Sequence, residues 1–349
     1  MELIIADPEG KELGYLATKL DNLEADMDVG GTNDYVLNVS LSEWPMDLYG
    51  YGYRIYIPDT EYGGRIQGMQ VSESTDSLTL SGDLWRGMLA KKIIEPPAGQ
   101  DYRSVSGEAH AILLSLTSGL FGDLFVVPDA SSGIQINSYS FDRYTDLLTG
   151  LSKMLATADA RLNIAYRRGD DGCTGYVELS AVPVVNYSED ESYSEDSDVW
   201  FMTQDVRNGI NHLICLGKGD LKDRQVLHLY VQKDGSIGDQ KYYTGLDERT
   251  SVYDFSNAAT IEELRTGGIG RLRELQDYRK FDMQVDQSPA EIGDIVGGRE
   301  FTTGFLIQQP VIQKIVRIVN AEVSIECKVR GSDAANGKIK NVPVKKGEK

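Results

Sequence analysis

The clearest pattern in the chain is a strict alternation of apolar and polar residues near its end. From 319 to 330 every second side chain is apolar, and each residue between them is polar or charged. Because successive side chains of a β-strand point to opposite faces, this pattern predicts sheet structure with one buried face. The apolar members are Val319, Ala321, Val323, Ile325, Cys327 and Val329.

The first 80 residues alternate in a similar way. In "YVLNVSL" the apolar Tyr35, Leu37 and Val39 fall on one side, and "GYRIYIP" and "GRIQGMQV" are bounded by turns rich in Gly, Pro and Asp. We therefore expect a small antiparallel unit. A short helix at 83–94, with Asp83 at its N-cap, is expected to end it before "EPPAGQDY" breaks the chain.

Residues 104–183 change to an α+β pattern. "SGEAHAILLSLTSGLFG" predicts one helix and "SFDRYTDLLTGLSKMLATADARL" a stronger one, and the strands "LNIAYRR" and "GYVELSAVPVV" flank the turn-forming "GDDG". The stronger helix is expected to have one continuous apolar face. Its members are Phe141, Tyr144, Leu147, Leu148, Leu151, Met154, Leu155 and Ala158.

A second strand-rich region begins at 199. "NHLICLGKGDLKDRQVLHLYVQKDGSIGDQKYYTG" predicts strands joined by Gly- and Asp-containing turns. "ATIEELRTGGIGRLRELQDY" predicts an exposed helix, although Gly267, Gly268 and Gly270 each weaken it by about 1 kcal/mol.

Two stretches of the chain share a pattern. "YGGRIQGMQVSESTDSLTLSG", from 62, and "PVIQKIVRIVNAEVSIECKVRG", from 310, each contain an aliphatic strand, a polar break and a second alternating strand that ends in glycine. Any two β-hairpins would share much of this pattern. It nevertheless suggests two related β units, separated by inserted α+β material.

An acidic run, "YSEDESYSEDSD", occupies 187–198. Its composition is open to three interpretations: a metal loop, a catalytic carboxylate cluster and a junction between domains. A calcium loop of the EF-hand type needs a glycine at its sharp turn, and none occurs here. Like charges without an apolar period cannot bury themselves, so the run is interpreted as a linker. Its acidic members are Glu189, Asp190, Glu191, Glu195, Asp196 and Asp198.

The whole chain is acidic, with a formal net charge of −19 over 349 residues. That length predicts about two to four domains. No apolar run is long enough for a membrane span, and the N-terminus lacks the pattern of a secretory leader. Cys173, Cys215 and Cys327 lie in apolar or strand-like sequence without CxxC spacing, which predicts reduced, packed thiols.

Several longer blocks resemble a known family. "GLDERTSVYDFSNAATIEELRTGGIGRLRELQ", "EIGDIVGGREFTTG", "NGINHLICLGKGDLKDRQVLHLYVQKDGSIGD" and "LTLSGDLWRGMLAKKIIEPPAGQDY" are similar to Gp37-like tail proteins of siphophages and prophages of Gram-positive hosts. The resemblance covers nearly all of 1–330. That family is in turn similar to tail-tip, or baseplate, hub proteins.

The resemblance implies a mainly β, α+β fold with two related antiparallel β-barrel tube domains and inserted α+β domains. A homotrimer would then present six similar units to the sixfold tail. The implied division is 1–95 for the first barrel, 96–186 for the α+β insert, 187–198 for the acidic linker, 199–255 with 281–330 for the second barrel, 256–280 for a helical insertion, and 331–349 for a flexible basic tail. Many relatives continue into peptidase, lysozyme-like or fibre domains, so their cell-wall-cutting role is in doubt for this chain.

The implied partners follow from a hub position in the virion tail tip after synthesis in the bacterial host cytoplasm. They are further copies in a homotrimer, a distal tail protein or tail tube ring, the tape measure protein, and receptor-binding or fibre proteins, with no stable membrane insertion. DNA would be met only in transit. A channel wall of Lys and Arg would retain duplex DNA by counterion release, whereas an acidic wall would let it slide. The alternative is that the acidic charge only keeps the protein soluble.

Motifs of known catalytic chemistry are missing from the sequence. It has no GxSxG, HExxH, Walker loop or complete GxGxxG, so no catalytic, cofactor-binding or metal residue and no cofactor is expected. His110 is predicted to be a helix-surface or packing residue. His212 and His228 lie on neighbouring predicted strands, and pairing register decides whether they share a face. Without a third ligand at suitable spacing they are interpreted as packed side chains.

The three tryptophans and 19 tyrosines could form a sugar-binding surface or subunit interfaces. An interface is predicted for Trp85, while Trp44 and Trp200 stay open. The tail at 331–349 carries a net charge of +3 and could instead pair with an acidic neighbour. Two functions from different classes therefore remain: a structural trimeric hub, and an enzyme or lectin that acts on cell-wall polymer through the insert at 96–186.

Overall fold

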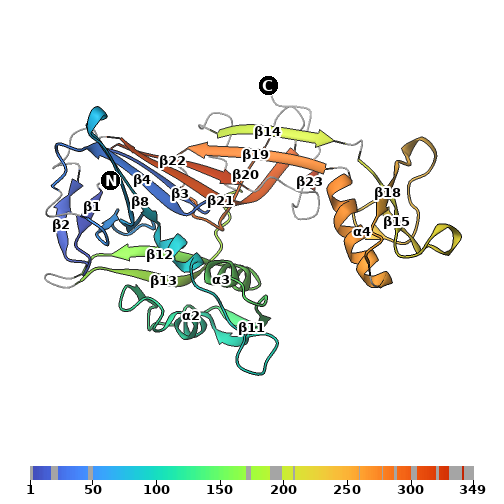
Figure 1. Ribbon diagram of the computed structural model, residues 1–349, viewed down its shortest axis with the longest axis horizontal. Coiled ribbons are helices and arrows are strands. Elements are labelled where there is room, and N and C mark those ends of the chain that lie inside the picture. The colour runs from blue at the N-terminus through green and yellow to red at the C-terminus, as the bar shows by residue number, and fades with distance from the viewer. Residues whose placement is uncertain are drawn as a thin grey trace, which may run out of the picture. The chain divides into compact units, whose positions relative to one another are not determined.

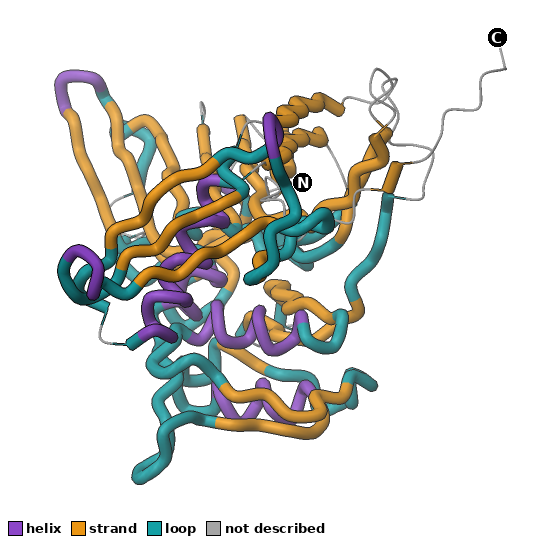
Figure 2. The backbone as a smooth tube through the Cα atoms, turned by 90° about the vertical axis from the view of Figure 1, so that its right-hand side faces the viewer, coloured by secondary structure: helices purple, strands orange, loops and turns teal. Residues whose placement is uncertain are grey.

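The computed structural model describes most of the chain in twelve ranges. They are 3–16, 23–45, 50–169, 174–188, 199–206, 209–258, 260–276, 278–286, 289–299, 305–319, 322–329 and 340–341. The chain divides into two compact units. Unit 1 contains Met1–Val199, Gln284–Gly297 and Pro310–Val329, and unit 2 contains Trp200–Met283, Gly298–Gln309 and Arg330–Lys349. Strands form most of the regular structure (Figures 1 and 2).

Unit 1 contains a long antiparallel sheet in the order β22-β21-β3-β4-β8-β7, and the end of β19 pairs with β22. Its strands are β3 (Glu24–Val29), β4 (Asp34–Ser40), β7 (Gly68–Ser72), β8 (Ser77–Asp83), β19 (Tyr278–Asp286), β21 (Phe305–Val319) and β22 (Glu322–Val329). In β3 and β4 every second side chain is buried, as the alternation requires. β19 and β21 each contribute residues to both units.

A smaller antiparallel sheet lies in the same unit, in the order β2-β1-β5-β6. These strands are β1 (Ile4–Ala6), β2 (Glu12–Tyr15), β5 (Arg54–Tyr56) and β6 (Gly63–Arg65). Apolar side chains of both sheets share one core, which includes Ile5, Leu37, Ile55, Leu80 and Val316. Residues from both ends of the chain therefore fold around a common apolar centre.

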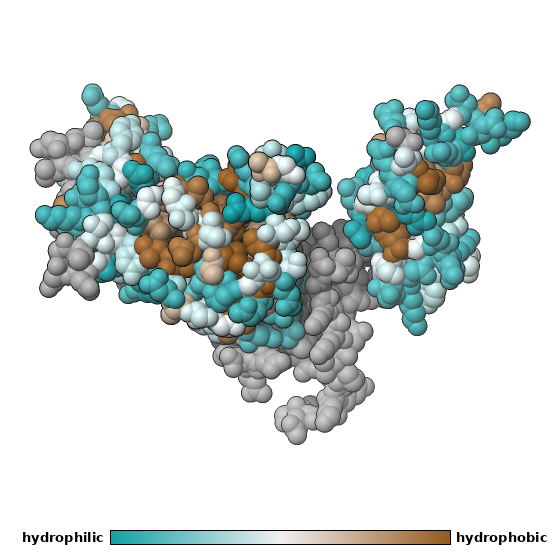
Figure 3. All heavy atoms as spheres, turned by 90° about the horizontal axis from the view of Figure 1, so that it is seen from below, coloured by the Kyte–Doolittle hydropathy of each residue, from teal (hydrophilic) through white to brown (hydrophobic). Residues whose placement is uncertain are grey.

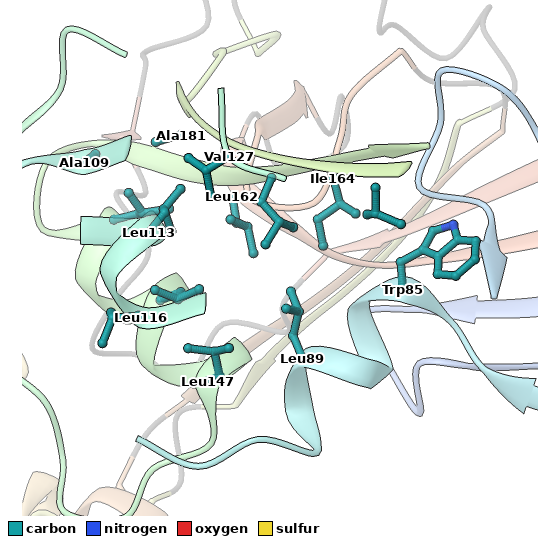
Figure 4. Close-up of a cluster of buried hydrophobic side chains, with 14 of the residues drawn as sticks. Trp85, Leu89, Ala109, Leu113, Leu116, Val127, Leu147, Leu162, Ile164 and Ala181 are labelled. Carbon is teal, nitrogen blue, oxygen red and sulfur yellow. The ribbon is translucent and has the colours of Figure 1, made fainter. Parts of the chain in front are cut away.

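Residues 96–186, which we call the insert, contain both helices and strands and lie within unit 1. Strands β12 (Ala160–Arg167) and β13 (Tyr176–Pro183) pair in register, and β10 (Phe125–Val126) joins β13 in parallel. β9 (Ser104–Glu108) pairs with β11 (Gln135–Ser140), while α2 (Ala109–Thr117) and α3 (Leu147–Ala156) pack beside these strands. Figure 4 shows side chains from α1 (Trp85–Ala90), the two helices and β12 meeting in one core.

Three local expectations were wrong. Leu84, not Asp83, is the N-cap of α1, and no side chain caps that helix. α3 begins only at Leu147, because Asp146 caps it by accepting a hydrogen bond from the Thr149 backbone N–H. Tyr144 lies before the helix with a φ of 56° and is exposed, so it is not part of the apolar face.

Unit 2 includes a four-stranded sheet in the order β17-β16-β15-β18. Its strands are β15 (His212–Leu216), β16 (Val226–Val231), β17 (Ile237–Gly238) and β18 (Thr250–Asp254). Helix α4 (Ile261–Leu275) packs on β15 and β16. Gly268 permits this approach, because a Cβ there would lie 2.5 Å from Cys215 Sγ. β14 (Val199–Val206), next to β19, lies in this unit except for Val199, and β23 (Lys340–Asn341) pairs with β21. β20 (Ile295–Arg299) also pairs with β21, and its residues are divided between the two units.

The mainly β, α+β class is confirmed, but no sheet closes into a barrel within the described ranges. The two stretches with a shared pattern do form antiparallel hairpins, β7 with β8 and β21 with β22. Both hairpins belong to the same long sheet and are separated in it by β3 and β4. The acidic linker lies outside the described residues from 189 to 198, and the basic tail does so except at 340–341.

Candidate functional site

Six charged side chains come together inside unit 1 and form three ion pairs. Arg86 donates to Glu61 Oε2 from Nε at 2.8 Å and from Nη2 at 2.7 Å. Arg161 Nε lies 2.7 Å from Asp294 Oδ1, and Lys314 Nζ lies 2.9 Å from Glu291 Oε2. Burial of an unpaired charge is costly, so each cation has an anionic partner. We call these six residues the ion-pair cluster: Glu61, Arg86, Arg161, Glu291, Asp294 and Lys314.

Separate parts of the fold position the cluster. Arg86 is on α1, Arg161 on β12 and Lys314 on β21. Asp294 lies in the segment before β20, where its Oδ2 accepts a hydrogen bond from the Glu291 N–H at 2.9 Å. Its Oδ1 also accepts one from the Val185 N–H at 2.9 Å. The cluster therefore ties the segment before β20 to the insert and to the long sheet.

Four members of the cluster, Glu61, Arg86, Arg161 and Glu291, line a small pocket of about 80 Å³. Burial raises the pKa of the Glu291 carboxyl, an effect that nearby Lys314 opposes. Two carboxyl groups with different surroundings, Glu61 and Glu291, could suggest acid–base cleavage of a sugar. The cavity is several times smaller than the roughly 300–1,000 Å³ of ligand pockets, so it can hold water but not a sugar ring. In this conformation the cluster stabilises the fold.

Sequence reasoning did not find this cluster. The available signal was Lys314, which has the same strand phase as the buried Val316 and Ile318 and is itself 1% exposed. A lysine on the buried face of a strand requires a counter-charge. The identity of that counter-charge depends on tertiary structure.

Trp85 is fully buried, so the prediction that it forms a subunit interface is wrong. Its ring stacks on Tyr166 with centroids 5.4 Å apart, and Tyr166 stacks on Tyr56 at 3.8 Å. The three rings join α1, β12 and β5 within one core, and Figure 4 shows Trp85 at one end of that core. Trp44 is also buried, whereas the side chain of Trp200 lies outside the described part.

His110 is a packing residue, as predicted. It is buried in α2, with Nδ1 2.6 Å from the Ala130 carbonyl oxygen and Nε2 accepting from the Ala181 N–H at 3.1 Å. The prediction of packed thiols is confirmed for Cys215 and Cys327, and burial raises the pKa of Cys215. Cys173 lies outside the described residues.

His212 and His228 share a face of the sheet in unit 2. His212 Nε2 lies 2.9 Å from His228 Nδ1, and His212 Nδ1 lies 2.9 Å from Glu248 Oε1. The expectation of packed side chains is correct for His212, which is 8% exposed, but wrong for His228, which is exposed. In the described ranges, no three His, Cys, Asp or Glu side chains are arranged to hold a metal ion.

A larger cavity, of about 500 Å³, borders the insert. One part of its wall is apolar and includes Phe121, Leu124 and Val126, and another carries Arg54 and Arg65. Its volume is within the range of ligand pockets. Nothing in its lining forms a nucleophile–base pair of the hydrolase type.

Exposed apolar side chains occur on and after α2. Leu114 is 52% exposed, and Leu120 and Val126 are each 39% exposed. Figure 3 views the molecule from the side of α2, and hydrophobic side chains gather on that face of the insert. Exposed apolar groups of this kind are typical of protein contact surfaces. No helix in the described residues is long and apolar enough to cross a membrane.

Comparison with known proteins shows similarity in structure but not in sequence. The chain matches no known family profile, including the Gp37-like one, and no curated protein. One similar structure is the 43 kDa tail protein of prophage MuSo2 from Shewanella oneidensis, with a TM-score of 0.50 and 10% sequence identity. The match includes 95% of this chain and 99% of that protein. A second is a protein of the phage P2 baseplate in its activated conformation with Ca, with a TM-score of 0.50 and 13% sequence identity. That match includes 94% of this chain and 98% of the P2 protein. The chain therefore shares the mainly β fold of phage tail and baseplate proteins.

Proposed function

We propose that this protein is a structural component of a phage or prophage tail. The observation that carries the proposal is the match of nearly the whole chain to nearly the whole of two tail proteins. The ion-pair cluster agrees with it, because its charges are paired with one another and the pocket beside them is too small for a sugar ring. Contacts with other tail components fit the exposed apolar side chains of the insert.

The finer proposal is a homotrimeric hub at the tail tip. It would join the tail tube to the host-facing tip, contact the tape measure and receptor-binding proteins, and form part of the DNA channel. The domain division given by sequence belongs to this proposal, with the hairpins β7/β8 and β21/β22 as equivalent parts of two related sheet modules. A net charge of −19 per chain supports an acidic channel wall that does not retain DNA.

The mass of the purified chain in solution tests the hub proposal. We expect a species of three times the 38.6 kDa chain, and particle images with threefold symmetry. A chain that stays monomeric up to roughly 100 µM, well above a micromolar dissociation constant, would contradict a stable trimer. A predominantly basic channel surface in an experimental structure of the assembly would contradict the DNA-sliding role.

The cavity beside the insert supports a second candidate function, that of a cell-wall glycan-binding protein. Its volume and mixed lining fit a small polar ligand. Binding and cleavage of purified peptidoglycan distinguish the two functions. A trimer without either activity supports the hub, and a monomer with sugar binding that Arg54→Ala abolishes supports the lectin.

A further inference from the structure

We propose that His212 and His228 form a binding site for a late first-row divalent transition metal ion. The two histidines lie on β15 and β16, on the sheet face opposite to α4. Their positions are diagonal, since His212 pairs with Tyr230 and His228 pairs with Ile214 in the antiparallel ladder. Diagonal neighbours on one face are within reach of each other's long side chains.

The separation of the two ring nitrogens fits one metal ion. His212 Nε2 and His228 Nδ1 are 2.9 Å apart. Imidazole nitrogens bind a divalent metal at about 2.0–2.1 Å, so two of them at right angles around one ion, as in square-planar or octahedral coordination, lie about 2.9 Å apart. An ion that replaces the shared proton lies to one side of the line between the nitrogens, so both rings turn towards it. The near-parallel stack of His212 on Tyr230, with centroids 4.4 Å apart, holds the inner ring in place.

The inner histidine already has the support that metal-binding histidines usually have. Its Nδ1 lies 2.9 Å from Glu248 Oε1 and 3.1 Å from Thr250 Oγ1. A carboxylate at this position fixes the proton on Nδ1 and leaves the Nε2 lone pair free to bind a metal. The other oxygen of Glu248 is held by Lys241 Nζ at 2.7 Å.

Metal binding to the neutral histidine pair needs no proton donor or acceptor other than the two histidines. In the metal-free pair His228 donates its Nδ1 proton to His212 Nε2. When the ion binds, that proton moves to His228 Nε2, and the Nδ1 lone pair is used for the metal. No net proton is released from the neutral pair.

Water completes the coordination, since the described residues supply no third His, Cys, Asp or Glu ligand. His228 is on the exposed side of the pair, which leaves room for water there. Imidazole ligands favour Cu²⁺, Ni²⁺ and Zn²⁺, and Cu²⁺ usually binds more tightly than the other two. Ca²⁺ and Mg²⁺ prefer oxygen ligands and are not expected to bind.

Titration calorimetry of the full chain with each metal salt tests the site, in a Cys173→Ser background that removes one thiol. We expect one Cu²⁺ or Ni²⁺ per chain. Replacement of His228 by Ala removes this stoichiometric binding with no change in far-UV circular dichroism, because its side chain is exposed. Glu248→Gln weakens binding by about tenfold or more. Glu262→Gln, an exposed residue on α4, is the matched control and leaves the affinity unchanged.

A spectroscopic measurement on the unmodified chain keeps the test independent of how the variants fold. The electron paramagnetic resonance spectrum with one equivalent of Cu²⁺ is expected to show coupling to two imidazole nitrogens. Three results would each overturn the proposal. They are a spectrum without coupling to imidazole nitrogens, binding at full affinity after replacement of His228, and an unmodified chain that binds no ion in a 1:1 ratio.

Discussion

The strongest structural prediction concerns Asp294, whose carboxylate is fully buried. It accepts hydrogen bonds from Arg161 Nε, from the Val185 N–H and from the Glu291 N–H. Substitution of Asp294 by Asn keeps the shape but removes the charge. One oxygen becomes an NH₂ group that faces a donor, and Arg161, only 12% exposed, loses its counter-charge.

Removal of one partner from a buried ion pair costs about 3–5 kcal/mol, because the remaining charge stays buried without compensation. A matched control is Asp142→Asn. Asp142 lies 2.6 Å from Lys153, but the side chains are 68% and 56% exposed. Exposed pairs contribute about 0–1 kcal/mol. The two ion pairs have similar distances, but the loss in the free energy of unfolding should be severalfold larger for Asp294→Asn than for Asp142→Asn.

Urea unfolding, followed by tryptophan fluorescence, measures this difference. Trp85 is buried in the same core as the strand that carries Arg161, so it reports on the relevant unit. Hydrogen exchange at the Val185 and Glu291 amides adds a local measurement, because both amides donate to Asp294. Replacement of both partners by apolar residues, Arg161→Met with Asp294→Leu, should recover part of the loss. Equal losses for Asp294→Asn and Asp142→Asn would refute the reasoning.

Two further predictions use local geometry. Gly270→Ala should stabilise the chain by about 0.5–1 kcal/mol, because helix propensity improves and a Cβ there meets nothing within 4 Å, whereas Gly268→Ala should destabilise it through the clash with Cys215 Sγ. Urea unfolding followed by circular dichroism compares the two variants, and a stabilising Gly268→Ala would contradict the packing argument. Burial opposes ionisation of Glu108, but hydrogen bonds from Ser132 and from the Ala111 N–H lower its pKa to about 2. The contribution of ionised Glu108 to the free energy of unfolding is therefore complete above the ordinary pKa of about 4.5 and is lost as the pH falls towards 2. Glu108→Gln should cost about 1 kcal/mol at neutral pH and flatten the stability profile over that range, and an unchanged profile would contradict this assignment.

Sequence pattern predicted the elements whose signal is local. β12, β13 and β22 lie where the sequence predicts strands, and the alternation of β22 buries Cys327 and Val329, because successive side chains of a strand face opposite ways. Val319, which was expected on the same buried face, ends β21 and is 48% exposed. α4 also lies within the stretch predicted to be helical, and its N-cap Thr260 accepts a hydrogen bond from the Glu263 N–H. Helix beginnings were less predictable. A turn with a left-handed Tyr144 interrupts the apolar period before α3, and that period alone gives no sign of it.

The ion-pair cluster shows which information the pattern lacks. Asp294 and Arg161 are 133 residues apart in sequence, and neither has a local reason to be buried. The burial of Trp85 likewise depends on other strands, because Tyr166 of β12 stacks on its ring and Tyr56 of β5 stacks on Tyr166. Such contacts need the relative placement of several elements, which no window of sequence determines.

The long sheet also gives a physical reason for the repeated pattern. β8 pairs with β4 and β21 pairs with β3, so each hairpin extends one side of the central β3–β4 pair. Leu78 and Leu80 of one hairpin and Val316 and Ile318 of the other reach the same apolar core. Two hairpins that cover one core need the same alternation, whether or not they arose by duplication. The shared core therefore explains the repeated pattern without a duplication, and the proposed sixfold match rests on a trimer, which the mass in solution tests.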